Sequence, residues 1–310
     1  DVLEGGAGGD TLNGGGDADT LFGDGGNDTL NGDAGNDTLN GGAGNDAING
    51  NGGDDTIQYA IGDGIDTING AAGVDTLVIT GGVGDDVLDV RYNGTSLITV
   101  EGGGVTNVEV VNANLQLGSD TLNYSTTAAA VAVAVNLTTG VASGFTSIVN
   151  IENVTGGLGN DNIVGSNGAN VLAGFNGSDI VNGAGGDDII AATTGDGNDT
   201  YIGGAGIDFY NLANTTAGAS VNLATGVSSS AQTGADSLSG IEGVLGSFGA
   251  DNITGSAGND IIDGGNAVDV INGGAGNDTL TGGQGNGDVV NGGAGNDTLI
   301  YNFGDGSDAF

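Results

Sequence analysis

The chain has 310 residues and a formal net charge of -39, because 40 acidic side chains stand against one basic side chain, Arg91. Such a charge repels phosphate groups, so we expect neither nucleic acid nor an anionic membrane surface as a partner. The longest apolar run, Ala128–Val135, is far shorter than the ~20 residues that span a bilayer, so we expect no membrane span.

The first predicted element is a run of nine-residue repeats over residues 1–78. Its unit is G-G-x-G-x-D-x-U-x, where U is a large apolar residue, as in "GGAGNDAIN" at residues 41–49. The U side chains are the expected core. The sixth position of successive units is always an aspartate: Asp10, Asp19, Asp28, Asp37, Asp46, Asp55, Asp66 and Asp75.

Residues 79–155 follow as a predicted β-strand interlude, with alternating stretches such as "LITVEG". A second run of repeats covers residues 156–211, and residues 212–245 form a second strand-rich interlude. A third run covers residues 246–310, and we expect it to continue beyond the chain. The sixth positions of these two runs are Asp161, Asp179, Asp188, Asp199, Asp208, Asp251, Asp260, Asp269, Asp278, Asp288, Asp297 and Asp308.

Several positions depart from the pattern. Asn170 replaces a sixth-position aspartate and Ala267 replaces a fourth-position glycine, so we expect weak or absent sites there. Two extra residues precede a "GDGxD" unit in each run, and this unit brings a further aspartate, for which we expect a turn role: Asp63, Asp196 and Asp305. Tyr201, Tyr210 and Phe310 at the U position predict wider coils, and we expect Arg91 to form a surface ion pair.

The spacing of the repeat predicts an all-β fold, a right-handed parallel solenoid. Closely spaced glycines allow a tight turn that gathers backbone carbonyls, and the aspartate adds a carboxylate two residues later. The next three residues are extended, with U pointing to one side. Two units then make one coil, and coils ~4.8 Å apart bring the aspartates of units n and n+2 together. Because these carboxylates repel, we predict a cation between them.

Oxygen ligands in a large, flexible cage favour Ca²⁺ over Mg²⁺. About one Ca²⁺ for each of roughly twenty sixth-position aspartates would supply about forty positive charges. This nearly balances the formal charge of -39. The sequence therefore predicts folding that depends on calcium.

The motif "GGAGNDTL", at residues 273–280 and 292–299, resembles the repeats-in-toxin (RTX) family, whose calcium-binding nonapeptides form a parallel β-roll. The resemblance implies a large secreted bacterial surface protein, exported by type I secretion and folded outside the cell. It also implies that carbonyls of the glycine-rich turn complete the calcium shell around each listed aspartate. Both interludes resemble the segments that separate RTX runs in such proteins, so we expect them not to bind calcium.

We expect no enzyme, because the chain has no His, Cys or Lys for a nucleophile–base pair. Two structural roles stay open: a calcium-stiffened segment of a surface protein, or a self-assembling subunit of a layer, sheath or filament. In the second role, copies would join end to end or through bridging calcium. A calcium module at the C-terminus of a secreted enzyme or toxin is a third, weaker hypothesis.

Overall fold

The computed structural model describes residues 1–301 and 309. Within this part of the chain it contains β-strands and no helix, and so none that could cross a membrane. The all-β prediction is therefore confirmed. The residues group into two compact units, Asp1–Asn153 (unit 1) and Val154–Phe310 (unit 2). The predicted division into five segments stays a prediction.

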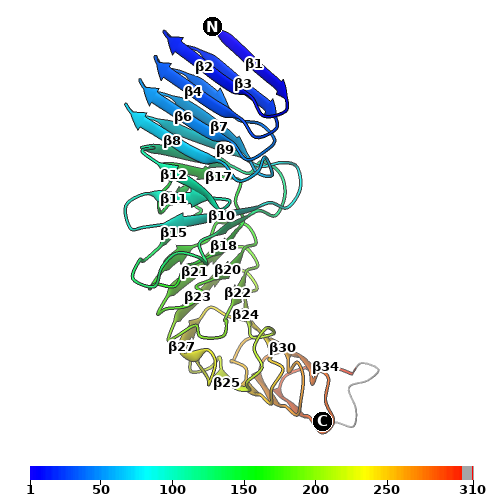
Figure 1. Cartoon of the computed structure of the whole chain (residues 1–310). Coiled ribbons are helices and arrows are strands. Elements are labelled where there is room, and N and C mark those ends of the chain that lie inside the picture. Colours follow the sequence, from blue (N-terminus) through cyan, green and yellow to red (C-terminus); the bar gives the residue numbers. More distant parts are fainter. Residues whose placement is uncertain (302–308, 310) are drawn as a thin grey trace. The chain divides into compact units, whose positions relative to one another are not determined.

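Unit 1 is built from strands that alternate between two sheets. One sheet has the order β1-β3-β5-β7-β9-β13-β17 and the other contains the run β2-β4-β6-β8-β12-β11-β10-β14. Figure 1 shows these strands stacked along the unit, the odd-numbered early strands beside one another and the even-numbered ones likewise. Their bounds are β1 Val2–Ala7, β2 Thr11–Gly16, β3 Thr20–Gly25, β4 Thr29–Ala34, β5 Thr38–Asn40, β6 Ala47–Gly52, β7 Thr56–Ala60, β8 Thr67–Ala72, β9 Thr76–Thr80, β10 Val87–Tyr92, β11 Leu97–Val100, β12 Gly103–Thr106, β13 Val110–Asn114, β14 Thr121–Asn123, β15 Ala134–Asn136, β16 Val141–Ala142 and β17 Ser147–Val149.

The regular strands of unit 1 pair in parallel and in register with the strand one full coil away. Leu3 pairs with Leu21, and Leu21 with Leu39, so that equivalent repeat positions lie side by side. The interlude adds antiparallel pairs: β10 with β11, β11 with β12, and β15 with β16. The two-unit coil that the spacing predicts is thus present, with a local change of strand direction inside the interlude.

Unit 2 repeats this plan. Its sheets contain the runs β18-β20-β22-β24-β28-β30-β32-β34 and β19-β21-β23-β27-β26-β25-β29-β31-β33. All pairs are parallel except β25 with β26 and β26 with β27, which belong to the second interlude. The bounds are β18 Asn153–Thr155, β19 Asn162–Val164, β20 Val171–Ala173, β21 Ile180–Gly185, β22 Ile189–Ala191, β23 Thr200–Ala205, β24 Phe209–Asn211, β25 Ala219–Asn222, β26 Val227–Ser230, β27 Gly234–Ser239, β28 Gly243–Leu245, β29 Asn252–Thr254, β30 Ile261–Asp263, β31 Val270–Ala275, β32 Thr279–Thr281, β33 Val289–Ala294 and β34 Thr298–Ile300.

The core of both units is a column of U-position side chains. Leu21, Leu39 and Ile48 have no exposed surface. Burial of one such aliphatic side chain stabilises the fold by about 1.5–3 kcal/mol. In unit 2 the column also contains Tyr201 and Tyr210, which are equally buried and whose ring centroids lie 5.6 Å apart. Two bulky rings thus replace two aliphatic side chains inside unit 2.

Candidate metal centre

The sixth-position aspartates form ladders along the turns of each unit. The backbone N–H of Asp19 donates to Oδ1 of Asp37 at 2.8 Å, and the N–H of Asp37 donates to Oδ1 of Asp55 at the same distance. The same bond joins Asp10 to Asp28 and Asp28 to Asp46. One oxygen of each carboxylate therefore holds the register of neighbouring coils, as the expected approach of units n and n+2 requires.

The second carboxylate oxygen has no such partner in most coils. Oδ2 is buried and accepts no hydrogen bond within the described residues at the following positions: Asp10, Asp19, Asp28, Asp37, Asp46, Asp55, Asp75, Asp120, Asp179, Asp188, Asp208, Asp269 and Asp278. A buried carboxylate oxygen without a donor or a cation is strongly unfavourable. Its repeated occurrence in one row indicates that a positive ligand belongs there.

The first glycine of the repeat leaves room beside this oxygen. A Cβ added at Gly14 would lie 2.8 Å from Oδ2 of Asp19 and 2.6 Å from the carbonyl oxygen of Gly32 in the next coil. A carboxylate and a carbonyl oxygen thus converge on space that any side chain would fill. We call this arrangement the glycine cradle: a first-position glycine whose added Cβ would meet Oδ2 of its own aspartate.

Burial disfavours the charged form of these carboxylates. Burial is the largest cause, a backbone N–H donor opposes it and neighbouring carboxylates add to it, so that the pKa of Asp179, Asp188 and Asp269 is raised to about 7. The pKa of Asp37, Asp46 and Asp55 rises for the same main reason. A nearby positive charge would therefore favour the ionised form of these carboxylates in the folded chain.

The ligands must be mixed, because no three carboxylates of the described part of the chain gather at one point where they could hold a metal ion. One or two carboxylates together with backbone carbonyls would make up a site. Such an all-oxygen, largely neutral ligand set suits a calcium ion, which accepts six to eight oxygens in flexible geometry. The residues present therefore fit calcium.

The structure places the other predicted positions as follows. Asp161, Asp251 and Asp260 have the glycine cradle, but in each case Oδ2 also accepts a backbone N–H of the turn. Asp288 and Asp297 also lie against a glycine in this way, and Asp308 lies outside the described residues. Asn170 keeps the ladder, since its N–H donates to Oδ1 of Asp188. No glycine of the described residues forms a cradle with Asp66 or Asp199.

Sequence reasoning missed two ladder positions in the first interlude. The N–H of Asp86 donates to Oδ1 of Asp120 at 2.8 Å, and the N–H of Asp120 donates to Glu152 at 3.0 Å. A Cβ at Gly81 would meet Oδ2 of Asp86 and the carbonyl of Leu115, so Asp86 has a cradle. The signal was available: residues 81–89 read "GGVGDDVLD", a complete repeat displaced by two inserted residues.

Glutamates that the sequence analysis also missed end the ladders. The N–H of Asp75 donates to Oε2 of Glu109 at 2.9 Å, and that of Asp208 donates to Oε2 of Glu242 at 3.1 Å. Glu109 directly precedes β13 and Glu242 directly precedes β28. Each glutamate thus takes the place that the aspartate takes in a regular repeat. Where the glycine-rich turn is absent, the longer glutamate side chain therefore accepts the hydrogen bond of the last backbone N–H of the ladder.

In the "GDGxD" turn of the second run, the extra aspartate accepts a hydrogen bond from the backbone of the same turn. Oδ2 of Asp196 accepts the backbone N–H of Thr193 at 2.7 Å, as Oδ2 of Asp63 accepts that of Ala60 in the first run. This contact matches the turn role expected for both residues. Asp305 lies outside the described residues. Asp196 is fully buried, and burial raises its pKa to about 7.

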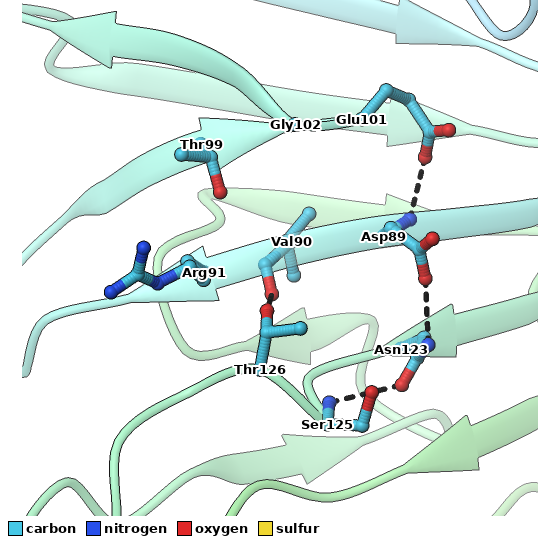
Figure 2. Close-up of a pocket in the computed structure, with 9 residues that line it drawn as sticks. All are labelled: Asp89, Val90, Arg91, Thr99, Glu101, Gly102, Asn123, Ser125 and Thr126. Carbon is cyan, nitrogen blue, oxygen red and sulfur yellow. Dashed lines mark hydrogen bonds between the residues drawn. The ribbon is translucent and has the colours of Figure 1, made fainter.

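Arg91 lies in a separate groove of about 570 Å³ on the outside of β10, β11 and β14 (Figure 2). The carboxylate of Asp89 accepts a bond from Asn123 at 2.6 Å, and Glu101 accepts the N–H of Asp89. In Figure 2 the Arg91 guanidinium points away from both carboxylates. Within the described residues Arg91 forms no ion pair, so the expected surface pair is not present.

Comparison with known proteins agrees with this chemistry. The family model of the RTX calcium-binding nonapeptide repeat (4 copies) matches residues 1–30, 22–57, 155–190, 193–210, 245–280, 267–288 and 279–308. These matches cover more than half of the chain, and the chain belongs to this family. No curated protein matches it.

Membership of this family defines the class of protein. RTX nonapeptide repeats bind calcium, form β-rolls and are structural repeats without catalytic residues of their own. They typically occur in secreted bacterial proteins, which indicates an extracellular location. The chain is accordingly a calcium-binding structural segment of a secreted protein.

Proposed function

We propose that this chain is a calcium-stiffened segment of a large bacterial surface protein, exported by type I secretion and folded by extracellular calcium. The observation that carries the proposal is the row of buried Oδ2 atoms without donors. In low calcium these carboxylates would have to be buried either protonated or charged without a partner, and this cost opposes formation of the coils. In high calcium the same atoms become ligands, and binding then stabilises only the folded state.

The proposed ligands are the aspartates that have a glycine cradle, each acting with a backbone carbonyl of a turn. Bound calcium supplies the positive charge that these carboxylates lack. The set comprises Asp10, Asp19, Asp28, Asp37, Asp46, Asp55, Asp75, Asp86, Asp161, Asp179, Asp188, Asp208, Asp251, Asp260, Asp269, Asp278, Asp288 and Asp297. We propose about one calcium ion for each of these positions.

Circular dichroism of the whole chain tests this function. With excess chelator at low salt we expect most of the β-signal to be lost, and with millimolar Ca²⁺ we expect it to return. Mg²⁺ at the same concentration is the control, and it should restore much less, because it keeps its waters and demands stricter geometry. A full β-signal in chelator would show that folding does not depend on calcium.

A second candidate function is a subunit that assembles with copies of itself. One observation favours it: outward side chains of neighbouring strands form an apolar row, Val171, Ile189, Phe209 and Ile261. Phe209 lies over Gly243, whose added Cβ would collide with the ring. In a chain of charge -39, a contact made through these uncharged side chains would not place carboxylates directly against each other.

Light scattering separates the two functions. A compact monomer in millimolar Ca²⁺ would support the stiffened segment. Growth into polymers, reduced by Phe209→Ser, would support assembly through this face. If Phe209→Ser forms the same polymers, the contact between copies lies elsewhere and the apolar row does not mediate assembly.

A further inference from the structure

Two ladder positions of unit 2 differ from the cradle positions in what meets their second oxygen. At Asp199, Oδ1 accepts the N–H of Asp179 at 2.7 Å, as in any regular coil. Its Oδ2, however, accepts the hydroxyl of Tyr201 at 3.0 Å. At Asp236, Oδ1 accepts the N–H of Asp199 at 3.1 Å and Oδ2 accepts the hydroxyl of Tyr210 at 2.7 Å. Each oxygen of both carboxylates therefore lies within hydrogen-bond distance of a protein donor.

The side chains of the two tyrosines are buried away from solvent. Tyr201 and Tyr210 have no exposed surface, and each occupies a U position inside the coil. The Tyr201 hydroxyl has one proton, which it shares between Oδ2 of Asp199 and Oδ2 of Asp196 at 2.9 Å. The Tyr210 hydroxyl lies 3.1 Å from that of Ser228. Burial beside carboxylates raises the pKa of Tyr201 well above its ordinary value, so the phenol keeps its proton.

A neutral phenol in this place opposes a cation. Its proton, which is the positive end of the O–H dipole, points at the same Oδ2 that a calcium ion would need. The space for an ion is also different, because no glycine of the described residues forms a cradle with Asp199 or Asp236. Residues five positions earlier, Thr194 and Ala231, carry side chains where the regular repeat has glycine.

We propose that the hydroxyls of Tyr201 and Tyr210 take the place of calcium at Asp199 and Asp236, so that these coils need no calcium to satisfy their carboxylates. The positions of Asp199 and Asp236 are then calcium-independent within a calcium-dependent solenoid, whereas Asp208 between them keeps an Oδ2 without a donor and stays a proposed ligand. This inference rests on the proposed function at the other turns. It removes Asp199 from the ligands that the sequence predicts.

Counting bound calcium by equilibrium dialysis of the full chain tests this proposal. Asp188→Asn is the matched comparison, because Asp188 lies in the same unit and has both the cradle and an Oδ2 without a donor. We expect Asp188→Asn to lose about one ion relative to the unchanged chain. Asp199→Asn and Asp236→Asn should lose none. Asparagine keeps an oxygen for the ladder amide in all three variants.

The outcomes are distinct. If the unchanged chain binds no calcium, the proposed function fails at once. If it binds calcium and Asp199→Asn loses as many ions as Asp188→Asn, the tyrosine proposal is wrong while the function stands. Circular dichroism in calcium checks that each variant is folded. Should Asp199→Asn be unfolded, Tyr201→Phe decides: loss of the hydroxyl should either add one bound ion or speed amide exchange of Thr200–Ala205 in chelator, and no change in either would overturn the proposal.

Discussion

The coils around Leu39 in unit 1 and those around Tyr201 in unit 2 share one backbone register but satisfy their carboxylates differently. In both, a backbone N–H one coil away binds Oδ1 of the aspartate. At Asp37 the other oxygen is buried without a donor, whereas at Asp199 a phenol donates to it. The same fold can thus leave a carboxylate for a cation or close it with a side chain, according to the core residue and the first residue of the repeat.

The largest expected effect compares these two regions directly. In excess chelator, amide hydrogens of Thr20–Ala60 should exchange at least about tenfold faster than those of Thr200–Ala205 and Gly234–Ser239, because the aspartates at these two strands, Asp199 and Asp236, accept tyrosine hydroxyls. Hydrogen exchange with mass spectrometry measures both in one sample. Tyr210→Phe should remove the difference at Gly234–Ser239, which contains Asp236. Tyr59→Phe is the control, because the Tyr59 hydroxyl donates to the carbonyl of Gly64. Equal exchange rates of the two regions in the unchanged chain would show that the tyrosine hydroxyls do not stabilise their coils without calcium.

A charge in the aliphatic core should be the next largest effect. Leu39 has no exposed surface, and Leu39→Asp places an unpaired carboxylate among apolar neighbours. We expect a loss of about 4 kcal/mol or more in millimolar Ca²⁺. Asp37→Ala should lose only about 1–2 kcal/mol, since it disturbs one turn. Thermal unfolding measures both, and equal losses would contradict the coil core described above.

Filling a cradle should have a smaller effect. Gly14→Ala brings a Cβ within 2.8 Å of Oδ2 of Asp19, so we expect a loss of about 1–3 kcal/mol together with weaker calcium binding at that turn. Gly16→Ala is the matched control, because nothing lies within 4 Å of its added Cβ. That change should stay within about 0.5 kcal/mol. If both variants bind calcium with similar affinity, the space beside the first-position glycine is not part of the calcium site.

The smallest effect concerns a position where unit 2 lacks the carboxylate. Asn170→Asp restores a ladder aspartate beside the cradle glycine Gly165. We expect one additional bound ion and a gain of about 1.4 kcal/mol when calcium is ten times the dissociation constant of the site. In chelator the sign should reverse, because the added charge has no partner. Calorimetric titration measures the number of bound ions and their affinity. An unchanged ion count would show that the missing carboxylate is not what prevents calcium binding at this turn.

The sequence by itself determined the repeat, the parallel all-β fold, the apolar column and most of the aspartates that line the turns. These features are local: a nine-residue period specifies a turn, a strand and the direction of each side chain. The complete repeat at residues 81–89 was equally visible, but two inserted residues displaced it from the frame that ends at residue 78.

Only the tertiary structure decided which carboxylates keep an oxygen free for a cation. Tyr210 and Asp236 are 26 residues apart in the sequence, with β25 and β26 between them. Asp236 lies on β27, which pairs antiparallel with β26, and this pairing fixes the contact. A U-position tyrosine predicts a wider coil, but its partner depends on which strand the interlude places beside it. A hydrogen bond forms only within about 3 Å, so this choice is made by packing across coils and not by the period of the repeat.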